Sequence, residues 1–115
     1  MNIGLFYSVV CFVAVHLMVW FSANLQFVSE DWTTKSLWVA LALSLPITLC
    51  AYYGARFGYY ALSESAWGVR FLAFALSYLI FPFLTYYLLG ESMFTIKTLL
   101  CVLLSFVIIA IQLFM

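Results

Sequence analysis

The chain has 115 residues, and its composition is 69% hydrophobic but only 7% charged. Soluble domains carry about 25% charged residues, so this composition excludes an ordinary water-soluble domain. The formal net charge is zero, which gives no indication of a nucleic-acid partner. At this length we expect a single domain over residues 1–115.

Four apolar segments are long enough to cross a membrane as helices, because about 20 residues at 1.5 Å each span a hydrocarbon core of about 30 Å. The predicted helices cover residues 3–27, 37–62, 67–89 and 94–115. The first segment lacks the basic start of a signal peptide, so we interpret it as a retained helix. The sequence therefore predicts an all-α integral membrane protein with four transmembrane helices in two hairpins.

The predicted connections are short. Residues 29–35 form the most polar segment, and Trp32 and Trp38 mark it as an interfacial loop with an aromatic belt. Residues 63–66 form a second short turn, and residues 90–92 predict a tight third turn. Pro46 lies near the middle of the second helix and predicts a kink, because proline removes a backbone donor there.

The basic residues are balanced between the two ends of the predicted bundle. Arg56 and Arg70 flank the second turn, whereas Lys35 and Lys97 lie at the opposite end. The positive-inside rule therefore gives no orientation. Two interpretations stay open: insertion in both orientations with antiparallel dimers, or one orientation set by a weak bias. We expect a multi-pass protein of a bacterial-type inner or plasma membrane.

His16 is the one titratable side chain expected deep in a helix, on a face shared with Trp20. Ionisable groups inside a membrane are functional candidates. His16 could serve as a proton-linked gate or a substrate contact. The alternative is a neutral histidine that is hydrogen-bonded to a neighbouring helix.

Arg56 is the second candidate, because helical spacing places it among Tyr52, Tyr59 and Tyr60. A cation in that setting could hold an anionic headgroup or a carboxylate, with cation–π support. Alternatively, Arg56 could reach the headgroup region from the end of its helix.

Small residues recur at a spacing of four, which lets membrane helices approach closely. The pairs are Gly54/Gly58, Ala73/Ser77 and Cys101/Ser105. They could form seams within one chain or between two chains.

The sequence carries no pattern typical of an enzyme. It has no Gly-rich phosphate loop, no HExxH motif and no Cys–His spacing for zinc. The single histidine leaves little for nucleophilic catalysis. We therefore expect no enzymatic activity, no metal and no cofactor.

The segment Leu-Thr-Tyr-Tyr-Leu-Leu-Gly-Glu-Ser-Met-Phe-Thr-Ile-Lys at residues 84–97, followed by an apolar last helix, resembles the closing hairpin of the drug/metabolite transporter superfamily. The segment Arg-Phe-Gly-Tyr at residues 56–59, after a proline-bearing helix, is similar to a four-helix branch of that superfamily. The four-span plan also resembles the small multidrug resistance proteins, which work as antiparallel dimers.

One feature departs from that resemblance. Small multidrug resistance exporters carry an essential glutamate in the first helix, whereas this chain has no acidic residue there and has His16 at about that depth. The resemblance therefore does not imply that this chain exchanges protons for cations.

These observations predict a small drug/metabolite-type transporter that works as a homodimer among membrane lipids. The expected substrate is an amphipathic, aromatic or lipid-like metabolite held between helices near the midplane. The predicted site comprises His16, Trp20, Tyr52, Arg56, Tyr59, Tyr78 and Tyr86. The alternative is a non-transporting membrane protein: an accessory or assembly subunit, or a pore-forming lysis protein.

Reporter fusions to the two termini separate the two interpretations of orientation. If the chain inserts in both orientations, the reporters should detect each terminus on both sides of the membrane. A single orientation of both fusions would remove the antiparallel dimer.

Overall fold

The computed structural model describes residues 3–114. Its elements are α1 (Ile3–Asn24), a short 3-10 helix η1 (Leu25–Phe27), α2 (Trp32–Ala61), α3 (Ala66–Leu84), a π-helix η2 (Thr85–Leu89) and α4 (Ile96–Phe114). Four helical segments of this described part are long and apolar enough to cross a membrane. The all-α prediction and the four predicted spans are thus confirmed at the level of length and composition.

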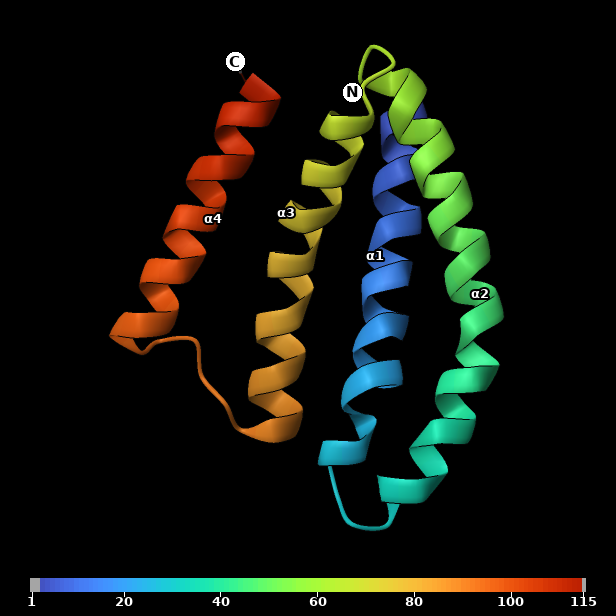
Figure 1. Ribbon diagram of the computed structural model, residues 1–115, viewed down its shortest axis with the longest axis vertical. Coiled ribbons are helices and arrows are strands. Elements are labelled where there is room, and N and C mark those ends of the chain that lie inside the picture. The colour runs from blue at the N-terminus through green and yellow to red at the C-terminus, as the bar shows by residue number, and fades with distance from the viewer. Residues whose placement is uncertain (1–2, 115) are drawn as a thin grey trace.

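The helices form a flattened array in which α1, α2 and α3 contact one another and α4 lies at the outer edge. α1 contacts both α2 and α3, whereas α4 packs against α3 at the outer edge (Figure 1). The molecule extends 46 × 37 × 19 Å, and its thinnest dimension is about two helix diameters. α1 begins and α4 ends at the same end of the molecule (Figure 1), as an even number of spans requires.

The pattern of small residues on α2 forms a seam inside the chain. Gly54 and Gly58 are buried against α1. Ser8 is fully buried there, and its Oγ donates to the Gly54 carbonyl oxygen at 2.8 Å. A Cβ at Gly58 would lie 2.7 Å from Ser8 Oγ, which is closer than real side chains come. The two glycines therefore permit the close approach of α1 and α2.

The apolar core is small and lies between α1 and α3. Phe12, Val69 and Leu76 form its buried cluster. Most other large apolar side chains are exposed; Leu45 is 73% exposed and Leu104 is 64% exposed. So much exposed apolar surface does not suit a soluble monomer, but it suits a protein that lies in lipid.

α2 differs from the predicted second helix at its start. It begins at Trp32 and not at residue 37. The amides of Trp32 and Thr33 donate to the carbonyls of Ser29 and Glu30, so the polar turn passes directly into the helix. α2 then continues through Pro46 to Ala61 as a bowed but unbroken helix (Figure 1).

The connection between α2 and α3 is as short as predicted. Ser63 and Glu64 have φ values of 58° and 60°, and the Glu64 amide donates to the Tyr59 carbonyl at 2.8 Å. Ser65 then caps α3 by accepting a hydrogen bond from the Gly68 amide at 2.9 Å. The chain thus reverses within residues 62–65.

The third connection is not the tight turn that the sequence suggested. Gly90 ends η2 in the left-handed region at φ 73°, and α4 begins only at Ile96. Ser92 Oγ accepts a hydrogen bond from the Phe94 amide, and Thr95 Oγ1 accepts one from the Thr98 amide. With these local hydrogen bonds, residues 90–95 stay outside the helix. The connection leads to α4 at the edge of the molecule (Figure 1).

We predict that Gly58→Ala lowers the free energy of unfolding in detergent by about 1–3 kcal/mol, because the added methyl group overpacks the contact with Ser8. Ser8→Ala removes the Oγ that clashes with the new methyl group. The double variant Ser8→Ala/Gly58→Ala should therefore lose less stability than the sum of the losses in the two single variants. Thermal unfolding followed by circular dichroism measures both effects.

Ala42→Val is the control, because Ala42 is exposed on the same helix. A Gly58→Ala protein as stable as the wild type would contradict the α1–α2 seam.

Candidate functional site

α1 carries polar side chains that reach both neighbouring helices. His16 Nε2 lies 2.8 Å from the Ala73 carbonyl oxygen on α3. Because a carbonyl oxygen only accepts, Nε2 must carry the proton. Trp20 Nε1 donates to Thr85 Oγ1 at 3.0 Å. His16 therefore has the hydrogen-bonded arrangement that was one of its two predicted interpretations.

Trp20 and Thr85 are in contact where α1 packs against the C-terminal end of α3. Trp20 is 2% exposed and Thr85 is 7% exposed. Thr85 is the first residue of the π-helix η2, three residues after Pro82. Within residues 3–114 no buried side-chain nitrogen or oxygen lacks a hydrogen-bond partner. This seam is consequently a packed junction whose buried polar side chains are hydrogen-bonded.

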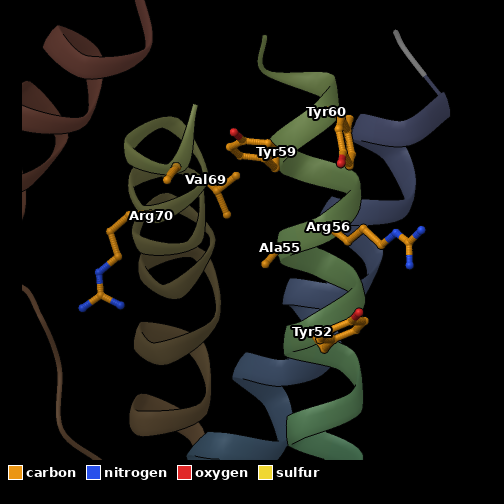
Figure 2. A pocket seen from close by; sticks show the side chains of 8 residues that line it. Tyr52, Ala55, Arg56, Tyr59, Tyr60, Val69 and Arg70 are labelled. Atoms are coloured by element: carbon orange, nitrogen blue, oxygen red, sulfur yellow. The ribbon is translucent and has the colours of Figure 1, made fainter. Parts of the chain in front are cut away.

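An open groove of about 630 Å³ lies between α2 and α3 near their short connection (Figure 2). Ala55, Tyr59 and Val69 occupy its middle, where the two helices face each other (Figure 2). Arg56 and Arg70 lie at its two edges and point away from each other (Figure 2). The groove thus joins an apolar, aromatic floor to two cationic edges.

The two arginines differ in their surroundings. The guanidinium of Arg70 lies 4.7 Å from the centre of the Phe74 ring, one turn further along α3. Arg56 lies between the rings of Tyr52 and Tyr60 along α2 (Figure 2). Neither arginine forms an ion pair with a carboxylate in the described part of the chain. Arg56 is therefore the cation with fewer protein partners.

A second hollow lies between α3 and α4, with a volume of about 340 Å³. Tyr78, Tyr86 and Phe106 contribute to its apolar lining. The hydroxyls of Tyr78 and Ser105 are 3.0 Å apart. Ser105 Oγ donates to the Cys101 carbonyl, so Tyr78 is the donor of the pair. Within residues 3–114 this hydrogen bond links α3 to α4.

The predicted site residues thus fall into three places. His16 and Trp20 lie in the α1–α3 seam, Tyr52, Arg56 and Tyr59 line the α2–α3 groove, and Tyr78 and Tyr86 line the α3–α4 hollow. Within residues 3–114 the structure does not bring all seven into one cavity.

Sequence reasoning placed Arg70 beside the second turn but did not include it among the predicted site residues. A usable signal was present, because Arg56 and Arg70 lie five residues before Ala61 and four residues after Ala66. Helical rise then places both at similar heights on either side of the turn. Thr85 gave no such signal, since its role depends on how α1 packs against α3.

No group of three or more histidine, cysteine or acidic side chains that could hold a metal ion occurs among residues 3–114. Comparison with protein-family models, curated proteins and solved structures gave no match. The resemblance to the drug/metabolite transporters therefore stays a prediction, and the geometry of the grooves is the basis for a functional proposal.

We predict that Trp20→Phe and Thr85→Val each destabilise the protein and that a double-mutant cycle gives a coupling of about 0.6 kcal/mol, with an upper bound of about 1.7 kcal/mol, as for other hydrogen bonds between membrane helices. Unfolding in detergent, monitored by circular dichroism, provides the four free energies. Trp38→Phe is the control, because Trp38 is 73% exposed. A coupling of zero would show that the Nε1–Oγ1 contact does not join the helices.

Proposed function

We propose that this protein is a multi-pass integral membrane protein of a plasma-membrane type. Its four long apolar helices and the exposed apolar side chains support this proposal. Charged residues such as Arg56, Arg70 and Lys97 lie near helix ends, where they can reach the headgroup region.

The function that the geometry supports best is a small transporter of an amphipathic, lipid-like metabolite. The observation that carries this proposal is the open α2–α3 groove, whose apolar floor is bordered by cationic edges near one end of the helices. An amphiphile could enter such a groove from the bilayer, with its apolar part on the floor and its polar part at the edge.

We further propose that the transporter is a homodimer. Within residues 3–114 α4 packs against α3 at the edge of a flat array, so the helices of one chain do not surround a route across the membrane. A second copy placed over the grooved face would close that route. The balanced distribution of basic residues allows the two copies to lie parallel or antiparallel.

A non-transporting accessory or assembly subunit is the second candidate. The observation that favours it is the packed α1 seam, where Ser8, His16 and Trp20 are all hydrogen-bonded to neighbouring helices. A protein built only to pack against partners needs no solvated route between its helices.

Reconstitution into liposomes that contain a phospholipid with a fluorescent headgroup separates the two candidates. A transporter of lipid-like molecules should expose inner-leaflet label to an impermeant external quencher faster than protein-free vesicles do. Arg56→Gln should slow this exposure about tenfold, because a lost charge-assisted contact costs about 1.4 kcal/mol or more.

Lys97→Gln is the matched control, since Lys97 is remote from the groove at the other end of the molecule. Folded protein that leaves the inner-leaflet label protected would contradict transport and favour the accessory subunit. An equal slowing by both variants would contradict the assignment of the groove.

A further inference from the structure

We infer that Tyr52, Arg56 and Tyr60 form a binding site for the phosphate of an anionic phospholipid, and that an acyl chain of this lipid lies along the α2–α3 groove. The inference depends on the proposed membrane location. It deepens the proposed function by naming the ligand chemistry, and it holds for a transported lipid as well as for a permanently bound one.

The geometry of α2 supplies the donors. Tyr52, Arg56 and Tyr60 recur at intervals of four residues, which places them in one column on the helix. Figure 2 shows the guanidinium of Arg56 on the outer side of α2, with one tyrosine ring above it and one below it. The tyrosines are 60% and 67% exposed, so their hydroxyls are accessible to a ligand.

The charge of Arg56 has no carboxylate partner in the described structure. Arg56 lies five residues before the end of α2 at Ala61, which corresponds to a depth of about 7.5 Å along the helix. From this position the guanidinium can reach the level of the lipid phosphates. A phosphate has the acceptor oxygens that match the forked donors of arginine, and the two phenols can add neutral donors.

Arg70 provides an internal contrast. It lies at the opposite edge of the groove and at the same end of the molecule, but its guanidinium packs over the Phe74 ring at 4.7 Å. No tyrosine column accompanies it on α3. Although the two arginines carry the same charge, the structure thus assigns phosphate binding to Arg56.

The groove floor explains why the ligand is a lipid of the bilayer and not a soluble phosphate. Ala55, Tyr59 and Val69 form a mostly apolar surface on the side of α2 that faces α3, and Arg56 lies at the edge of the same groove, with its side chain extending to the other side of α2 (Figure 2). An acyl chain on this surface would run along α2 and α3 as lipid chains run beside membrane helices. A free phosphate would leave this surface uncovered.

The experiment is native mass spectrometry of the purified protein in detergent with equimolar phosphatidylglycerol and phosphatidylcholine. These lipids can have the same acyl chains, so a preference reports on the headgroup charge. We expect wild type to retain phosphatidylglycerol preferentially. Arg56→Gln should reduce the preference about tenfold, as expected for a charge-assisted contact. Arg70→Gln, which removes the same charge at the same end, should reduce it less than twofold.

Removal of both phenols in Tyr52→Phe/Tyr60→Phe should reduce the preference several-fold with the charge unchanged. Circular dichroism establishes that each variant is folded. Arg56→Lys is the second variant if Arg56→Gln does not fold; it keeps the charge, loses the fork and should give an intermediate preference. Addition of millimolar inorganic phosphate should not release the lipid.

Three results would overturn the inference: no preference in wild type, equal losses in Arg56→Gln and Arg70→Gln, or release of the lipid by inorganic phosphate. Failure of the proposed transport is distinguishable from these results. It would leave the selective binding intact and would appear only as protected label in liposomes. Recovery of the protein from the soluble fraction would instead contradict the membrane location itself.

Discussion

The structure depends on the contacts that α1 makes with the helices on its two sides. Ser8 is hydrogen-bonded to the backbone of α2, His16 to the backbone of α3, and Trp20 to Thr85 at the start of η2. In lipid the hydrophobic effect does not drive helices together, so their association relies on close packing and on hydrogen bonds between helices. The proposed membrane location gives these contacts their importance, because water would otherwise compete for each of them. α4 lies outside this set and is joined to α3 by the bond between Tyr78 and Ser105.

This uneven attachment shapes the sites available for function. The seams of α1 are packed, whereas the spaces beside α2, α3 and α4 stay open as grooves. These hollows lie between neighbouring helices and are open at the surface of the helix array. This access suits a molecule that already lies in the bilayer, which is the common basis of the transport proposal and of the inferred lipid site.

The sequence predicted the helices well because their signals are local. Apolar length defined the spans, and the polar residues 63–65 indicated a short turn. The third connection was not predictable in the same way, because Gly90 and Thr95 set its length through backbone conformation and capping. The candidate residues were found by type, but their division among three places depends on which helices are neighbours. Hydropathy does not contain that information, since all four helices are apolar on most sides.

The most direct test of this account is a set of pairwise distances between spin labels in lipid nanodiscs, measured on a variant without native cysteines. Labels on exposed sites at similar heights can be placed at Leu17 on α1, Leu79 on α3 and Leu104 on α4. The flat array predicts an α1–α4 distance clearly longer than both the α1–α3 and the α3–α4 distances. An α1–α4 distance as short as these two would show a closed four-helix bundle and contradict the account.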